Sequence, residues 1–134
     1  LCTQCRVIEP MSAQELTEIL DDYTHAWPKD DARFDREQLR VDWLTRFGRE
    51  GQMVKYHTPG CIHCNQTGQK GRAGLHELMT VTRELRRLIQ TGARAEELQR
   101  QALIDGMRTL RQDGIEKVLA GITSMEEVRA TSNV

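Results

Sequence analysis

The chain has 134 residues, a length typical of one domain, and its 38% hydrophobic and 4% aromatic residues favour a helix-rich protein over a β-sandwich. No run of about 18 apolar residues is present, so the sequence predicts no membrane-spanning helix. The 20 acidic and 19 basic residues give a formal net charge of −1, which excludes overall charge attraction as the basis of nucleic-acid or membrane binding.

The four cysteines form two C-x-x-C pairs, Cys2 with Cys5 and Cys61 with Cys64. Two such pairs are able to present four thiolates to one tetrahedral Zn²⁺. A Pro-Gly turn before the second pair and a Thr-Gly turn after it are typical of a zinc knuckle, in which backbone N–H groups face the sulfur atoms. We therefore predict a structural zinc site, because four thiolates leave the metal no open position for a substrate.

Two other uses of the cysteines remain open from the sequence. The first is a pair of disulfides, although the spacing does not resemble a secreted disulfide framework. The second is the reactive thiol pair of a dithiol oxidoreductase, although neither C-x-x-C pair lies between a strand and a helix. We expect His57 and His63, which flank or lie within the second pair, to be solvated neighbours of the site and not ligands.

The stretch between the two cysteine pairs predicts a helical hairpin, inserted at about residues 11–51. Its first helix is expected over 11–27, with Ser12 as N-cap and Glu15 completing a capping box. The second is expected from Arg36 to Phe47, with Asp35 as N-cap. The residues expected on the apolar faces of the two helices are Leu16, Ile19, Leu20, Tyr23, Leu39, Trp43, Leu44 and Phe47.

Two short strands are expected around the second cysteine pair. Residues 52–56 lead into the pair, and residues 72–81 alternate loosely between apolar and polar side chains. Gly71 and Gly74 weaken the second prediction, because glycine inside a strand adds flexibility and no packing.

The remainder of the chain predicts four short helices that end at glycines and form a compact bundle. The first is expected from Thr82 to Gly92, and the second passes through Leu98, Ala102 and Leu103 and stops at Gly106. The third is expected from Thr109 to Gly121, with Leu110, Val118 and Leu119 buried. The last is expected to begin at Thr123, which forms a capping box with Glu126. The predicted class is mainly α with a small β element (α+β).

We divide the chain into a tetracysteine module at 1–80, which carries the insertion, and a helical subdomain at 81–134. Residues 9–50 hold eleven acidic and six basic residues, whereas residues 83–111 hold seven arginines and four acidic residues. Solvated helix faces explain this asymmetry; a contact between the basic helices and an acidic surface of a neighbouring subunit or partner is the other explanation.

The second cysteine pair and the residues that follow it, GCIHCNQTGQKGRAGLHEL from Gly60 to Leu78, resemble the zinc element of the type II secretion and type IV pilus assembly ATPases. The resemblance covers about two thirds of the chain. It also includes the opening LCTQC, ELRRLI at 84–89, DGMRTLRQDG at 105–114 and KVLAGITSMEEV at 117–128.

This resemblance implies a cytoplasmic hexameric motor at the inner-membrane face, in which a RecA-like core binds ATP and Mg²⁺ and drives an inner-membrane platform. The family's phosphate-binding loop, G-x-x-x-x-G-K-[ST], is absent from these 134 residues. We therefore expect this chain, which begins directly at a cysteine pair, to be a non-catalytic C-terminal part of a longer ATPase. Its expected partners are the rest of the ATPase, neighbouring subunits and an inner-membrane platform or assembly protein.

Two residues in the most regular part of the family segment, Arg72 and Glu77, are expected to make an intersubunit or interdomain contact. Thr3 stands where the family often has proline, and the segment from Met11 to about Lys55 is longer than the usual spacer. That segment is either a recognition element for a system-specific partner or a tolerated surface insertion.

The alternative function is a free-standing zinc protein that binds nucleic acid, since paired knuckles lie beside arginine-rich helices. The knuckle lacks the interleaved basic and aromatic residues that such binding uses, so we expect no nucleic-acid partner.

Overall fold

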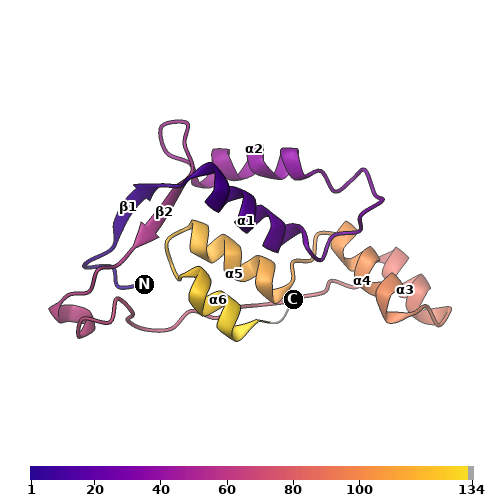
Figure 1. The fold of residues 1–134 in the computed structure, drawn as a ribbon. Coiled ribbons are helices and arrows are strands. Elements are labelled where there is room, and N and C mark those ends of the chain that lie inside the picture. Colours follow the sequence, from indigo (N-terminus) through magenta and orange to yellow (C-terminus); the bar gives the residue numbers. More distant parts are fainter. Residues whose placement is uncertain (133–134) are drawn as a thin grey trace.

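The computed structural model describes residues 1–132 and consists there of six α-helices and a two-stranded sheet (Figure 1). The elements, in chain order, are β1 (Val7–Pro10), α1 (Ala13–Thr24), α2 (Arg36–Phe47), β2 (Val54–His57), a 3-10 turn η1 (Ile62–Cys64), α3 (Arg83–Gln90), α4 (Ala95–Ile104), α5 (Leu110–Leu119) and α6 (Met125–Thr131). The predicted class, mainly α with a small β element, is confirmed. In the part of the chain described, no helix is long and apolar enough to cross a bilayer.

Helices α1 and α2 begin where their capping residues predict. Ser12 Oγ accepts a hydrogen bond from Glu15 N at 3.1 Å, and the Glu15 carboxylate accepts one from Ser12 N at 3.2 Å, which completes the predicted capping box. Asp35 accepts from the first free N–H groups of α2, at Glu37 and Gln38. Helix α1 ends at Thr24, three residues before the predicted end.

The insertion begins and ends at the sheet, because β1 and β2 pair in antiparallel register on either side of it. Val7 lies opposite His57 and Pro10 opposite Val54, and Met11 N donates to Met53 O at 3.0 Å. The prediction of a strand at 52–56 is confirmed, with bounds at Val54–His57. Strand β1 was not predicted.

The predicted strand at 72–81 is wrong for the structure described here. These residues form no regular element and run without turns from the knuckle to α3 (Figure 1). A strand needs a hydrogen-bonded neighbour, and the only sheet within residues 1–132 is formed by β1 and β2 alone.

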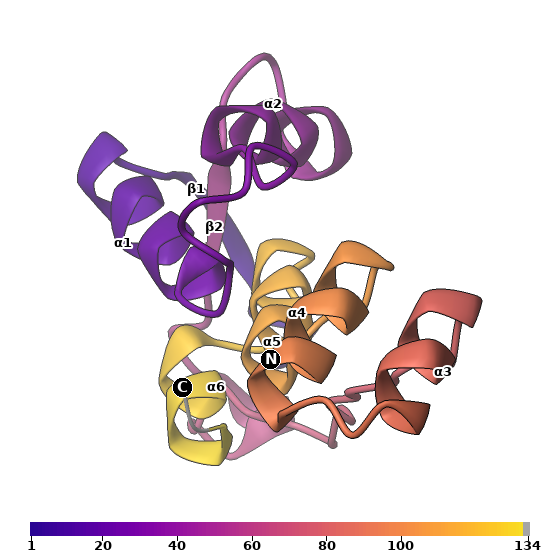
Figure 2. The ribbon, with the colours of Figure 1, turned by 90° about the vertical axis from the view of Figure 1, so that its right-hand side faces the viewer.

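The four C-terminal helices are arranged as two pairs, α3 with α4 and α5 with α6 (Figure 2). The N-cap of α6 is Ser124, whose hydroxyl accepts from Glu127 N, and not Thr123 as predicted. Thr123-x-x-Glu126 and Ser124-x-x-Glu127 are overlapping capping patterns, so the sequence alone does not separate them. Leu110, predicted to be buried, is exposed at the first turn of α5.

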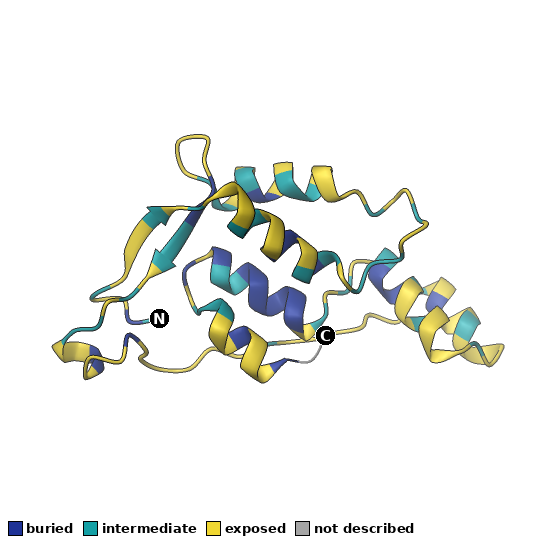
Figure 3. Ribbon diagram, viewed as in Figure 1, coloured by how far each residue is buried: buried dark blue, intermediate teal, exposed yellow. Residues whose placement is uncertain are grey.

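One apolar core joins the insertion to helix α5. Its centre is Trp43, which is fully buried and meets the Tyr23 ring edge-on with centroids 5.1 Å apart. The buried members of the core are Ile19, Leu20, Tyr23, Trp43, Met53, Ile115 and Leu119. Figure 3 shows that α5 is the most deeply buried helix, lying between α1 and α6. The core thus takes residues from both sides of position 80; the division into 1–80 and 81–134 stays a prediction.

A buried carboxylate on α5 makes a second link to the insertion. Glu116 accepts from Arg46 of α2 and from Arg108, each at 2.5 Å, and from Tyr23 Oη of α1 at 3.1 Å. Burial by itself would raise the pKa of Glu116, but the hydrogen bonds from Arg108 and Arg46 outweigh it and hold the pKa below its usual value. Glu116 therefore stays ionised inside the protein.

The basic C-terminal helices and the acidic insertion also meet within this chain. Asp31 binds Arg33 at 2.6 Å and Arg100 of α4 at 3.1 Å, and Arg129 of α6 binds Asp22 of α1 at 2.8 Å. The Arg33 hydrogen bonds, helped by the charge of Arg100, hold the pKa of Asp31 well below its usual range. Part of the charge asymmetry read from the sequence is thus neutralised inside the molecule.

Trp43→Ala should lower the free energy of unfolding by about 3–5 kcal/mol, because it removes a fully buried aromatic side chain. Val41→Ala on the same helix is the matched control; this valine is 44% exposed and its loss should change stability by no more than about 0.5 kcal/mol. Urea denaturation followed by circular dichroism measures both. Equal losses in the two variants would contradict the core described above.

Glu116→Gln should lower the free energy of unfolding at pH 7 by about 1–3 kcal/mol, because it leaves two arginines facing a neutral amide. A carboxyl whose pKa is lowered on folding stabilises the protein above its unfolded pKa and loses that effect as pH falls through the folded pKa. The difference between wild type and variant should therefore shrink between pH 5 and about pH 3. Glu126→Gln, at an exposed position on α6, is the control and should show no such pH dependence; the same behaviour in both variants would argue against a buried ion pair.

Candidate metal centre

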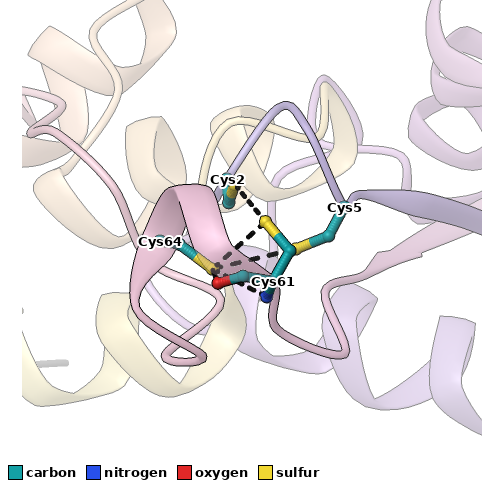
Figure 4. Close-up of side chains that lie close together, drawn as sticks. All are labelled: Cys2, Cys5, Cys61 and Cys64. Carbon is teal, nitrogen blue, oxygen red and sulfur yellow. Dashed lines mark hydrogen bonds between the residues drawn. The ribbon is translucent and has the colours of Figure 1, made fainter.

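The four cysteine side chains converge on one point, although the two pairs are far apart in sequence (Figure 4). All four sulfur atoms lie within 4.8 Å of one another. The sulfur of Cys2 is 3.7 Å from that of Cys61, and the sulfur of Cys64 is 4.0 Å from that of Cys5 and 3.8 Å from that of Cys61. The predicted clustering is confirmed.

These distances fit a tetrahedral zinc site and do not fit disulfides. Four sulfurs at about 2.3 Å from one Zn²⁺ in tetrahedral geometry are about 3.8 Å apart, close to the values observed here. A disulfide places its two sulfurs about 2.05 Å apart, far closer than any pair in the cluster. All four cysteines are free thiols in the structure. The donor set therefore fits Zn²⁺, for which Cys2, Cys5, Cys61 and Cys64 would be the ligands.

Two glycines allow the knuckle to close. Gly60 has φ +101°, and a Cβ there would lie 2.7 Å from Gln66 O; Gly68 has φ +76°, and a Cβ there would lie 2.5 Å from Thr58 Oγ1. Between them, the N–H of Gln66 donates to Cys61 O at 2.8 Å and closes the turn around η1. The first cysteine pair is joined to this turn by Cys2 N, which donates to Gly68 O at 2.9 Å.

Backbone N–H groups point at the buried sulfur of Cys64. The Gly68 N–H lies 3.2 Å and the Cys61 N–H 3.3 Å from it. Burial alone would raise the pKa of the Cys64 thiol, but these amides outweigh it and lower the pKa to about 6. By contrast, burial together with the neighbouring thiols raises the pKa of Cys5 to about 12. Four adjacent thiols do not all ionise without a counter-charge, and a bound divalent cation supplies one.

The other residues singled out from the sequence do not belong to the sulfur cluster. His57 and His63 are exposed and are not part of the metal-binding group. Glu77 accepts a hydrogen bond from Leu110 N at 3.1 Å and so satisfies a free N–H at the start of α5. Arg72 is exposed at the rim of a cavity of about 430 Å³ between the chain after the knuckle and α6. Their role in a contact with another subunit or domain stays a prediction.

The cysteine module rests on the turn between α5 and α6. Arg6, next to Cys5, donates to Gly121 O at 2.8 Å, and its guanidinium lies 5.0 Å from the centre of the Tyr56 ring. A Cβ at Gly121 would lie 2.9 Å from that ring, so only glycine lets the ring and the turn approach so closely. The contacts among Arg6, Tyr56 and Gly121 were not predicted from the sequence, because they join residues at least 50 positions apart and leave no local pattern.

A family model described as Type II/IV secretion system protein matches residues 1–130 of the chain. The chain belongs to this family. It is 33% identical over 128 residues to the type IV pilus assembly ATPase TfpB of Acinetobacter baylyi, an alignment that covers 96% of this chain and 18% of that protein.

Similarity extends to both kinds of system. The chain is 44% identical over 96 residues to the type IV pilus assembly ATPase PilB of Thermus thermophilus, covering 72% of this chain and 11% of that protein. It is 45% identical over 73 residues to type II secretion system protein E of Dickeya dadantii, covering 54% of this chain and 14% of that protein. The chain thus spans less than a fifth of the length of these curated relatives.

Cys61→Ser should abolish stoichiometric zinc binding and unfold the knuckle, because apparent zinc-binding energies of about 10–16 kcal/mol in small zinc domains are also folding energies. Metal content after purification and melting temperature measure the two effects. Ile62→Ser is the matched control, since this neighbour is 80% exposed and contributes no ligand atom. Normal zinc content and unchanged melting in the Cys61 variant would rule out the metal site.

Proposed function

We propose that the chain is the non-catalytic C-terminal part of a hexameric cytoplasmic ATPase that powers type II protein secretion or type IV pilus assembly. Within that protein it serves as a zinc-stabilised docking and intersubunit module. Family membership and the names of the relatives support the parent's activity. The chain covers only a small share of those relatives, which supports the proposal that a larger catalytic portion accompanies it.

The observation that carries the docking role is the convergence of the four sulfurs. A metal held there cross-links the chain on both sides of the insertion, and the same module contacts the α5–α6 turn through Arg6 and Tyr56. Such a cross-link fixes the relative positions of three segments without a large apolar core. A closed set of four thiolates suits this structural role and leaves no position for catalysis.

ATP and Mg²⁺ are assigned to the parent's remaining portion. The 134 residues contain no G-x-x-x-x-G-K-[ST] sequence, whose backbone amides and lysine would hold the phosphates. We therefore propose that this part positions the motor and does not itself hydrolyse ATP. It would meet neighbouring subunits and an inner-membrane platform or assembly protein from the cytoplasmic side, with Arg72 and Glu77 as candidate contacts.

The ion pairs of the structure weigh against the nucleic-acid alternative. Arg100, Arg108 and Arg129 each bind a carboxylate of this chain, which removes them as free cations for phosphate groups. The formal net charge of −1 also weighs against overall electrostatic attraction to a nucleic acid.

In the full-length protein, Cys61→Ser should abolish secretion or pilus assembly while nucleotide binding by the remaining portion stays within about twofold of wild type, because the module positions the motor and does not bind ATP. Complementation of a deletion strain and nucleotide-binding titration measure the two properties. Ile62→Ser should complement fully. Full complementation by the Cys61 variant would refute a docking role, and equal loss of nucleotide binding would place the module in the catalytic portion.

A further inference from the structure

Helix α3 carries two arginines that the chain leaves unpaired, and we call them the arginine face. Arg83 and Arg86 are three residues apart, so they lie on the same side of the helix, and both are exposed. Neither forms an ion pair within residues 1–132, whereas the neighbouring Arg87 binds Glu84 at 3.4 Å. Figure 1 and Figure 2 both show α3 packed on α4 at one end of the molecule. This end therefore presents positive charge that the chain itself does not neutralise.

A groove of about 370 Å³, which we call the acidic groove, lies between α4 and the loop that follows α1. Glu96 and Glu97, in the first turn of α4, line it and have no ion-pair partner in the described part of the chain. Arg100 also lines the groove, but it binds Asp31 at 3.1 Å, so its charge is already neutralised. The groove is thus left with two uncompensated negative charges.

Trp27 gives the acidic groove an aromatic wall. Its ring lies 6.1 Å from that of Tyr23 and 5.4 Å from that of Phe34, which hold the indole in place. The indole is only half-buried and lines the groove together with Pro28. An arginine is suited to such a site, because its planar guanidinium stacks on an indole while its N–H groups donate to carboxylates.

We infer that the arginine face of one copy of the chain binds the acidic groove of a neighbouring copy, an inference that rests on the hexamer of the proposed function. The two surfaces are opposite in charge, and neither is compensated by its own chain. A two-fold contact would bring identical surfaces together, and two arginine faces repel each other. The contact is therefore head-to-tail, the kind that closes into a ring when each subunit is rotated by a constant angle from the last.

A second copy suits both surfaces better than an unrelated basic partner would. In a closed ring, every subunit offers one arginine face and one acidic groove, so all of these charges are paired. A separate basic protein would fill the groove and leave the arginines of α3 without a partner. Complementary charges mainly determine which faces meet and in what orientation, so this contact sets the angle between subunits and is one part of a larger interface.

Sedimentation velocity of the full-length protein over a range of concentrations tests this contact. A face variant, Arg83→Glu with Arg86→Glu, should raise the concentration at which half of the subunits are assembled by at least about tenfold, because like charges then meet. A groove variant, Glu96→Arg with Glu97→Arg, should do the same for the same reason. The chain that carries all four substitutions should assemble within about threefold of wild type, because the charges are complementary again. Arg49→Glu, at an exposed arginine before β2, is the control and should change nothing.

Melting temperatures show whether each variant is folded, and rescue by the fourfold variant excludes a merely structural effect. Assembly that is unchanged in both the face and the groove variants would refute the contact. Losses that the fourfold variant does not restore would show that the two surfaces do not meet each other.

The proposed function is tested separately by complementation with Cys61→Ser. Unchanged assembly of the charge variants, in a protein whose transport depends on Cys61, would refute this contact alone. Charge-dependent assembly with transport independent of Cys61 would refute the docking role alone. Wild-type protein that stays monomeric at every concentration would refute the hexamer and this contact together.

Discussion

The arrangement of this chain depends on one constraint, that two C-x-x-C pairs separated by 55 intervening residues must present their sulfurs to a single point. The insertion between them must therefore leave and return at the same place. The antiparallel pairing of β1 and β2 satisfies this requirement, because it brings the two ends of the hairpin side by side directly beside the cysteines. Closing so long a loop is costly in chain entropy, and a metal bound by the four thiolates would compensate for that cost.

The hairpin is also attached to α5 at a distance from the sulfur cluster. Trp43 and Tyr23 pack on Ile115 and Leu119, and Glu116 binds one group from each insertion helix. A buried carboxylate is unfavourable unless its partners are in place, so this link makes the fold of α5 depend on the insertion. The long spacer is thus part of the folded core; any recognition of a system-specific partner must use its outer faces.

The sequence predicted the features that depend on local chemistry. Capping residues gave the starts of α1 and α2, the glycines around Cys61 and Cys64 gave the knuckle, and apolar spacing gave the core residues Trp43 and Tyr23. It did not predict β1, which becomes a strand only through its pairing with β2 across the insertion. Nor did it predict the contacts of Glu116, since nothing near this residue in the sequence distinguishes it from an exposed helix acid.

The wrong strand prediction at 72–81 also has a physical reason, because alternating side chains form a strand only where a neighbouring strand supplies hydrogen bonds. Asp31, Asp22 and Glu116 are paired with arginines within the chain, whereas Leu78, Met79 and Val81 remain exposed. Within residues 1–132 no second strand lies beside residues 78–81, so this segment forms no ladder and its apolar side chains stay exposed.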